Sequence, residues 1–405
     1  MVSKNNSFTG IDIHDHRKVL KTYLNRTEED KLNKKSILDY YQFIVNDNLS
    51  ISTQIKHLQV LLAISKQINK PFIEVKKDEM QKIVFKFRTN NSISPWTVHK
   101  YLVTLKKFYK WLYQTEDYPD LVKWIKSNVK NSQIKLPENL LSQEEVKKMI
   151  NVCRNSRDKC ILSMLNELGC RIGELLSIDI NSMQDSDDYF RVTIQHSKTQ
   201  PRKLKVIDSR HFIAQWLNEH STKAEGNAPL FIGIGPENKN ERLDYNACRA
   251  LLRNIAKRAG IHKAVNPHHW RHSTATRYAK FMSYSQLCYW FGWAIGSKTA
   301  SVYIHLSGQD LDSVVDEMRG KISIKKFEDT LAPKKCTYCH RENPGTNDLC
   351  EGCGASLTLN GVFKKEDRMN NFELEMKARQ KVVEEYIKFQ NEKLQRLEEI
   401  MENKN

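Results

Sequence analysis

The sequence contains no run of about eighteen uncharged apolar residues, which is the length that a membrane-spanning helix needs. Its opening stretch, MVSKNNSFTGIDIHDHRK, is polar and lacks the apolar core of a secretory signal. Both absences favour a cytoplasmic protein without a membrane partner. Nine cysteines in a reducing compartment are expected to be thiols rather than disulfides.

Acidic residues are in the minority, because 48 aspartates and glutamates face 65 lysines and arginines, which leaves a formal charge of +17. Such an excess of positive charge calls for a polyanionic partner, and nucleic acid is the usual one. With 405 residues, 40% of them hydrophobic, the chain is long enough for two or three compact domains. We therefore expect a nucleic acid as the partner, and the residues considered below narrow this to double-stranded DNA, with no small-molecule substrate.

The first half of the chain predicts a helical domain. Residues 1–25 show no convincing periodicity and are interpreted as a flexible arm, whereas residues 26–130 are helical in pattern throughout. Ser94 and Pro95 are a plausible N-cap and first position of the clearest helix, which carries lysines on its outer side. This basic face is either a DNA-clamping surface or simply the solvated side of a structural bundle. Residues 131–139 then read as an exposed linker.

Residues 140–326 predict a second domain, mainly α with a small β-sheet. Gly169 suits the left-handed cap of one helix, and Arg171 follows at the start of a short helix with apolar anchors. From Tyr189 to Ile207 the pattern switches to a period of two, interrupted by polar residues, which predicts a β-hairpin with Lys198 at its tip.

The stretch NPHHWRHSTATRYAKFMSYSQLCYWFGWAIGSKTASVYIHL, residues 266–306, is the centre of that domain. His268 and Arg271 are three residues apart and share one face of a helix. Trp293 and Tyr303 follow a helical hairpin's length later, so they can return to the same face. The sequence therefore predicts that these four side chains form one site.

Breaking a phosphodiester without hydrolysis needs a nucleophile, charge stabilisation and a proton donor. A tyrosine phenolate is a good leaving group, so a bond between Tyr303 and phosphorus can be reversed by a DNA hydroxyl. Arg171 and Arg271 offer planar forks for phosphate oxygens and never lose their charge. Lys198 is our candidate acid and His268 a base or acid that orients the phosphate, while Trp293 offers an indole N–H.

The same residues resemble the tyrosine recombinase, or phage integrase, family. The resemblance rests on LGCRIGELLSIDI, SKT, PHHWRHSTAT, FGW and YIHL, and it extends from about Leu49 to Leu306. It implies an α+β catalytic domain behind an N-terminal helical DNA-clamping domain, and protomers that self-associate on DNA, from a dimer to a tetrameric synapse. The chain looks most similar to the integrases of archaea and their mobile elements. The catalytic set that the resemblance implies is Arg171, Lys198, His268, Arg271, Trp293 and Tyr303.

The sequence departs from the family pattern in two places. Trp293 stands where most members have a histidine, and the spacing from Trp293 to Tyr303 is one residue longer than usual. Other tyrosines could compete for the nucleophile's role, and other lysines of the hairpin could reach the site in place of Lys198. The competing tyrosines are Tyr278, Tyr284 and Tyr289, and the competing lysines are Lys203 and Lys205.

Three functions are compatible with these residues. The first is a site-specific recombinase (integrase) that works through a 3′-phosphotyrosyl intermediate. The second is a relaxing enzyme with the same chemistry, similar to the type IB topoisomerases. The third is a DNA-binding regulator that keeps the fold without the chemistry, although a complete residue set argues against it. None of the catalytic roles requires a cofactor.

Four cysteines at residues 333–358 form a separate metal-ligand pattern. Cys336 and Cys339 are followed after ten residues by Cys350 and Cys353, which is the spacing of a zinc ribbon with one structural Zn²⁺. His340 is a conceivable substitute ligand. Because four protein ligands leave no open coordination position, this metal would organise structure and would not catalyse.

The chain ends in a charged helix over residues 364–403. Its apolar residues follow approximate heptad spacing, which Gln380 and Gln390 interrupt. The helix either pairs as a coiled coil or docks on its own chain or a neighbour as a single amphipathic helix. The apolar set consists of Phe372, Met376, Val383, Ile387, Leu394, Leu397 and Met401.

Overall fold

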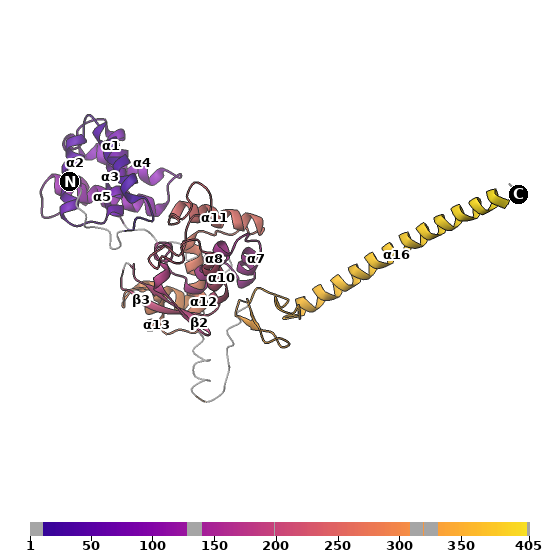
Figure 1. Ribbon diagram of the computed structural model, residues 1–405. Helices are drawn as coiled ribbons and strands as arrows, with labels where there is room; N and C mark the ends of the chain where they lie inside the picture. Colours follow the sequence, from indigo (N-terminus) through magenta and orange to yellow (C-terminus); the bar gives the residue numbers. More distant parts are fainter. Residues whose placement is uncertain (1–10, 128–139, 198, 308–318, 320–330, 403–405) are drawn as a thin grey trace.

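The computed structural model describes residues 11–127, 140–197, 199–307, 319 and 331–402. Two separate hydrophobic cores divide the described residues into an N-terminal helical domain and a second, larger domain. Figure 1 shows these two domains, a small C-terminal module and one long helix that projects away from the rest. The predicted fold class, mainly helical with small antiparallel sheets, is confirmed. Among the described residues, no helix combines the length and apolar character needed to cross a bilayer.

The N-terminal domain is a bundle in which α3 packs against α1, α2, α4 and α5. Ser94 caps α5 as predicted, because its Oγ accepts a hydrogen bond from the backbone N–H of Thr97 at 3.2 Å. The domain's helices are α1 (His16–Glu28), α2 (Lys34–Asn46), α3 (Ile51–Ile68), α4 (Lys77–Thr89), α5 (Pro95–Leu112) and α6 (Asp120–Lys123), with a 3₁₀ turn η1 (Phe72–Glu74).

The prediction of a flexible arm over residues 1–25 is wrong for its second half, and residues 1–10 lie outside the described residues. Residues 16–25 belong to α1, whose Leu20 is buried in the bundle. Residues 11–15 lie against the second domain, where the Ile13 carbonyl accepts the N–H of Tyr245 at 3.0 Å and the Ile13 side chain joins the core. The apolar residues of this short segment are too few to produce a periodicity, which explains the error. The predicted linker, residues 131–139, lies outside the described residues.

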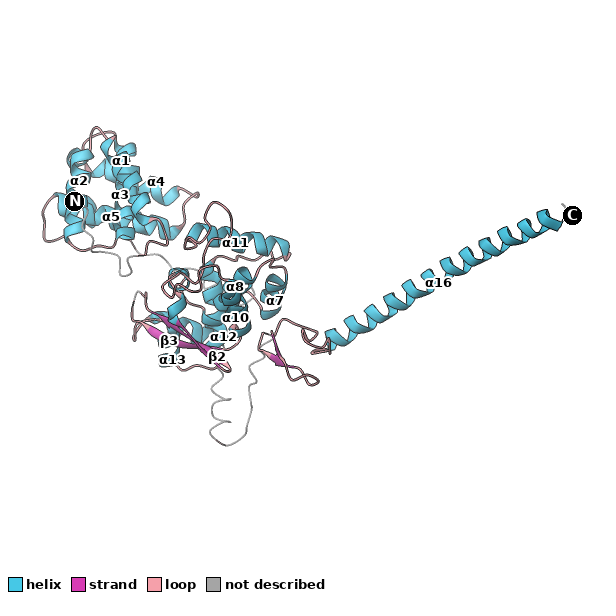
Figure 2. Cartoon of the chain, in the orientation of Figure 1, coloured by secondary structure: helices cyan, strands magenta, loops and turns pink. Residues whose placement is uncertain are grey.

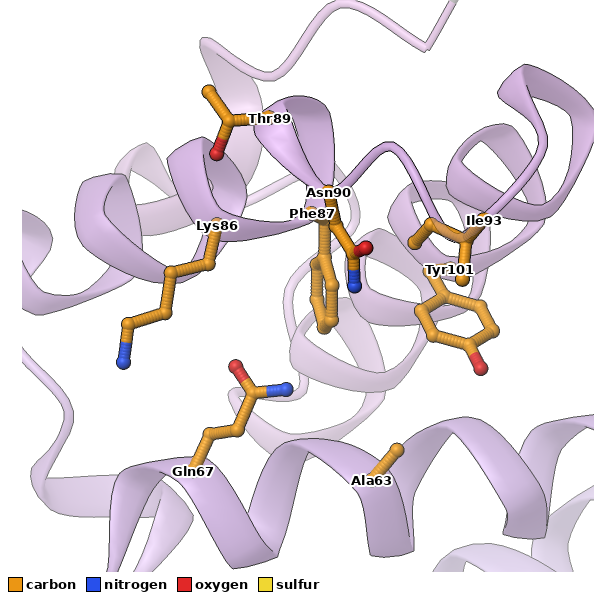
Figure 3. A pocket seen from close by; sticks show the side chains of 8 residues that line it. All are labelled: Ala63, Gln67, Lys86, Phe87, Thr89, Asn90, Ile93 and Tyr101. Carbon is orange, nitrogen blue, oxygen red and sulfur yellow. The ribbon is translucent and has the colours of Figure 1, made fainter.

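A groove of about 480 Å³ opens between α3 and the end of α4 (Figure 3). Gln67 and Lys86 lie on opposite sides of its opening, and the Phe87 ring points into it. None of the residues in the predicted catalytic set lines this groove. Its lining consists of Ala63, Gln67, Lys86, Phe87, Thr89, Asn90, Ile93 and Tyr101.

The second domain is built around α8, twelve of whose thirteen residues are buried. Helices α7, α10 and α12 contact it, and β3 lies against both α8 and α13. These helices are α7 (Gln143–Asn151), α8 (Ser156–Leu168), α9 (Ile172–Leu176), α10 (Arg210–Glu219), α11 (Tyr245–Arg258), α12 (Pro267–Tyr278), α13 (Tyr284–Phe291) and α14 (Lys298–Ser307). Figure 2 shows the strands at one side of this helical body.

The predicted hairpin is present, and a further strand joins it. Strands β2 (Tyr189–Ile194) and β3 (Arg202–Val206) are antiparallel, with Phe190 opposite Val206. The unpredicted strand β1 (Met183–Ser186) pairs with the other edge of β2 after the 3₁₀ turn η3 (Ile180–Ser182). Along β3, buried and exposed residues alternate, so that Arg202 faces the core. Lys198, at the predicted tip, lies outside the described residues.

The C-terminal module is a small ribbon followed by the long helix α16 (Leu359–Glu402). Its two short strands, β4 (Lys334–Lys335) and β5 (Glu342–Asn343), are antiparallel. Asp348 lies at the centre of the module's attachment, because it accepts hydrogen bonds from Thr358 and Lys364 and pairs with Lys147 of α7 at 3.5 Å. The ribbon is therefore fixed to the second domain, and the start of α16 is fixed to the ribbon.

Candidate active site and metal centre

The turn after α13 holds both predicted arginines through its backbone. The carbonyl of Gly292 accepts hydrogen bonds from both terminal nitrogens of Arg171, each at 3.2 Å. The preceding carbonyl, of Phe291, accepts one from Nη2 of Arg271 at 2.6 Å. Gly292 has a φ of 58°, and a Cβ there would lie 2.6 Å from Nη1 of Arg202. A glycine is needed at this position because of both its backbone conformation and its surroundings.

The buried carboxylate of Glu174 orients Arg171. Its backbone N–H and its Nη1 donate to the two oxygens of Glu174, both at 2.9 Å. The same carboxylate accepts hydrogen bonds from Arg202 at 2.9 Å and from Ser197 at 3.0 Å. Burial by itself would raise the pKa of Glu174, but its hydrogen bonds and ion pairs with Arg202 and Arg171 lower it below the ordinary value. Glu174 is therefore a carboxylate that fixes two arginines.

Arg271 is buried among carbonyls and rings. Its side chain also donates to the carbonyl of Gly169 at 3.1 Å, and its guanidinium lies 5.2 Å from the centre of the Trp293 ring. Burial and the positive charge of Arg171 lower the pKa of Arg271 to about 10. Arg271 therefore stays charged at neutral pH, and its guanidinium repels that of Arg171 within the same site. A bound anion such as a phosphate would relieve that repulsion.

Tyr303 lies near Arg271, whose charge acts on its phenol. It comes from α14, and its ring is stacked on that of Trp293, with centres 5.2 Å apart and planes at 4°. Burial raises the pKa of its phenol to about 12, although the charge of Arg271 acts in the opposite direction. The phenol is therefore protonated at neutral pH, and it needs a proton acceptor before it can attack.

The hydrogen-bond partner of this phenol is a residue that the sequence analysis did not single out, His272. The Tyr303 hydroxyl is hydrogen-bonded to Nδ1 of His272. His268 is exposed, and its ring packs against that of His272, with ring centres 4.3 Å apart. His272 follows His268 by four residues, a spacing that puts both on one helical face, so the sequence did carry the signal.

The competing side chains have other contacts. The hydroxyl of Tyr284 donates to the carbonyl of Ser297 at 3.1 Å and accepts the N–H of Gly296 at 2.9 Å, which ties the loop before α14 to α13. Nζ of Lys205 lies over the ring of Tyr189, on the face of β3 opposite to Arg202. The loop with the additional residue is thus held in place, and the structure brings together Arg171, His268, Arg271, Trp293 and Tyr303.

The four ribbon cysteines form one cluster. Their sulfur atoms all lie within 4.8 Å of one another, with 3.6 Å between Cys336 and Cys353 and 3.5 Å between Cys339 and Cys350. A tetrahedral Zn²⁺ with Zn–S bonds of about 2.3 Å requires sulfurs about 3.8 Å apart, so the cluster fits such an ion. His340 is not among the residues whose ligand atoms gather there. The four cysteines could therefore hold a metal ion.

Comparisons with known proteins agree with this geometry. Residues 139–310 match the model of the phage integrase family. Transposase A of transposon Tn554 from Staphylococcus aureus is 30% identical over 200 residues, 46% of this chain and 53% of that protein. Tyrosine recombinase XerA of Pyrococcus horikoshii is 28% identical over 145 residues, 35% of this chain and 49% of that protein. The chain thus spans about half the length of these curated relatives, which include both a bacterial and an archaeal protein.

The fold is shared with a solved recombinase structure. The XerH site-specific recombinase bound to palindromic difH substrate, in a post-cleavage complex, has a TM-score of 0.55 and 16% sequence identity. The match covers 78% of this chain and 99% of that one. The architecture of a helical domain followed by a mixed domain is therefore that of a known recombinase fold.

Proposed function

We propose, from the match of residues 139–310 to the model of the phage integrase family, that this protein is a site-specific DNA recombinase. It cuts and rejoins DNA through a covalent 3′-phosphotyrosine at Tyr303. The observation that carries the proposal is a Tyr303 hydroxyl hydrogen-bonded to an imidazole beside Arg271, next to the turn on whose adjacent carbonyls Arg171 and Arg271 converge.

In the cleavage step, the Tyr303 oxygen attacks the scissile phosphorus and its proton passes to Nδ1 of His272. The bond from phosphorus to the 5′ oxygen breaks, and that oxygen takes a proton from an acid. The products are a 3′-phosphotyrosine and a free 5′ hydroxyl. Attack by the 5′ hydroxyl of another strand reverses the step and joins the new partners.

Arg171 and Arg271 stabilise the charge that develops on the non-bridging oxygens. Hydrogen bonds to the carbonyls of Phe291 and Gly292 hold both forks in place, so little reorganisation is needed as charge develops on the phosphate. Lys198 serves as the acid for the 5′ oxygen, His268 contacts the phosphate, and Trp293 packs against the nucleophile.

The partner is double-stranded DNA, to which the excess of positive charge draws the protein. The N-terminal helical domain clamps the duplex opposite the catalytic domain, and protomers assemble on paired sites as a dimer or tetramer. The protein acts in the cytoplasm, on a chromosome or a mobile element.

Covalent capture tests the proposed function. The protein is incubated with a library of nicked suicide duplexes, from which a short product escapes after cleavage, and covalent complexes are isolated and sequenced. We expect capture at a preferred sequence, with the 3′ phosphate on the protein. Relaxation of supercoiled plasmids without any sequence preference would favour a topoisomerase-like activity instead. Binding without covalent capture would indicate a regulator.

Replacing His272 with glutamine should slow cleavage by roughly 10²–10⁴-fold, the usual contribution of a general base. Glutamine can keep a hydrogen bond to Tyr303, but it cannot take the proton. The rate of covalent capture at pH 7 measures the effect. An undiminished rate would show that another group receives the proton. His262→Gln, at an exposed histidine of the same domain, is the matched control.

The ribbon holds one structural Zn²⁺ through Cys336, Cys339, Cys350 and Cys353. When bound, the metal supplies cross-linking and no chemistry, because four thiolates fill its coordination sphere. The ribbon's own residues then fix the start of α16, through Asp348 and its contacts with Lys147 and Lys364.

Replacing the buried Cys350 with serine should remove the metal and unfold the ribbon. We expect zinc per chain, measured by atomic emission, to fall from about one to near zero, and residues 331–358 to become sensitive to limited proteolysis. Cys248→Ser removes a buried thiol in the catalytic domain, away from the cluster, and should keep the zinc. Full retention of zinc by the Cys350 variant would contradict the assignment.

A further inference from the structure

Helix α16 is long and exposed. Its 44 residues span about 66 Å at 1.5 Å per residue, and Figure 1 shows it leaving the body of the molecule. Every described side chain from Val362 to Lys388 is exposed. Helices in proteins draw most of their stability from packing of an apolar face, so a solitary helix of this kind needs a partner.

Four of the exposed apolar side chains of α16 lie on one stripe. Val362, Met369, Met376 and Val383 follow one another at intervals of seven residues and are between 41% and 57% exposed. A seven-residue repeat is the mark of a helix that pairs with another helix in a left-handed coiled coil. From Met376 onward the alternating three- and four-residue spacing is complete in the sequence, at positions 376, 380, 383, 387, 390, 394, 397 and 401.

We propose that α16 pairs in parallel and in register with α16 of a second copy of this chain. Two glutamines on the stripe determine both the partner and the direction. In a parallel pair in register, Gln380 meets Gln380 of the second copy and Gln390 meets Gln390, so the amides can bond to each other. In an antiparallel pair over the same positions, each glutamine falls opposite an aliphatic residue, which leaves a polar group unsatisfied.

Charges beside the stripe favour the same arrangement. In the parallel register, Arg379 flanks the stripe on one helix and faces Glu384 of the other, five residues further along. In the single chain, Glu384 accepts a hydrogen bond from Gln380 of its own helix at 3.2 Å, and pairing exchanges that contact for one across the interface. Since the ribbon fixes the start of α16, the pair would hold two chains side by side.

The pairing of α16 does not depend on the DNA chemistry, but its consequence for assembly on DNA rests on the proposed function. Two catalytic domains would reach DNA already joined, so the assembly on paired sites would start from dimers.

Sedimentation of the full-length protein without DNA tests the proposal. We expect a dimer at micromolar concentration. Replacing both Met376 and Val383 with glutamate should raise the dissociation constant by at least roughly 100-fold. Leu374→Glu places a glutamate at an exposed apolar position of the same helix but off the stripe, and it should leave the dimer intact. A monomeric wild-type protein, or a dimer that survives the double substitution, would overturn the proposal.

Disulfide formation tests the direction. Gln380→Cys should cross-link the two copies rapidly under mild oxidation, because the two residues face each other only in a parallel register. Glu385→Cys, on the outer side of the helix, should not cross-link. The reverse result would refute the parallel arrangement. Both readouts are independent of catalysis: a monomer that still captures DNA would refute only the pairing, and a dimer that captures none would refute only the recombinase activity.

Discussion

Tyr303→Phe should abolish covalent DNA capture, with a loss of at least roughly 1000-fold, while DNA binding stays within about twofold. The substitution removes only the oxygen that would attack phosphorus. The ring can keep its stacking on Trp293, so the hydrophobic cluster of α12, α13 and α14 should remain folded. Covalent complexes on a nicked duplex are counted after denaturing electrophoresis, and binding is measured by a mobility shift on the intact duplex.

Tyr289→Phe is the matched control. Its hydroxyl lies 3.5 Å from the carbonyl of Lys203, on the outer side of α13, and its side chain is 47% exposed. That variant should capture DNA as well as the wild-type protein does. Undiminished capture by the Tyr303 variant would move the nucleophile to another tyrosine, and Tyr284, next to the same loop, would be tested first.

Features set by neighbouring residues could be predicted from the sequence. The N-cap at Ser94, the left-handed Gly169 and the hairpin of β2 and β3 all follow from local rules, and the structure has each of them. The spacing of the ribbon cysteines likewise predicted a cluster that the structure brings together. Such elements need little information from distant parts of the chain.

Features that depend on distant residues could not be predicted in the same way. Glu174 and Arg202 are 28 residues apart, and only the folded sheet brings them into contact. The alternation along β3 puts Arg202 on the buried side of the strand, so this arginine needs a partner of opposite charge. The pattern does not show which residue that partner is. The docking of residues 11–15 on α11 joins residues more than 230 positions apart, and no local sequence pattern predicts it.

The site residues differ in how far the sequence alone could identify them. Arg171, Arg271, Trp293 and Tyr303 come from four elements, and a family resemblance was needed to gather them. The histidine at the nucleophile is different, because His272 is on the same helix as His268 and Arg271. Helical spacing alone could have identified it, but the sequence analysis singled out only His268 and Arg271 on this helix.

Glu174→Gln should lower the free energy of unfolding by about 3–5 kcal/mol, the cost of leaving a buried charge without its counterion. The side chain of Arg202 is 0% exposed, and its ion pair with Glu174 is at 2.9 Å. Glutamine keeps the size and one acceptor oxygen, so the loss comes from charge rather than from packing. Denaturant unfolding at pH 7 measures it. Asp185→Asn is the control, because Asp185 is 62% exposed and its ion pair with Arg210 is at 3.6 Å. This variant should change stability by less than about 0.5 kcal/mol.

The pH dependence gives this prediction a second test. The pKa of Glu174 is lowered in the folded chain, so its contribution to stability is fully present above the ordinary carboxyl pKa of about 4.5 and is lost as the pH falls through the folded value. The gap between wild type and Glu174→Gln should therefore be constant at neutral pH and close in acid. A gap that persists unchanged in acid would mean that the carboxylate acts by its shape alone. Because Glu174 also holds Arg171, the variant should lose covalent capture even where it remains folded, which separates the positioning of the arginine from the stability of the domain.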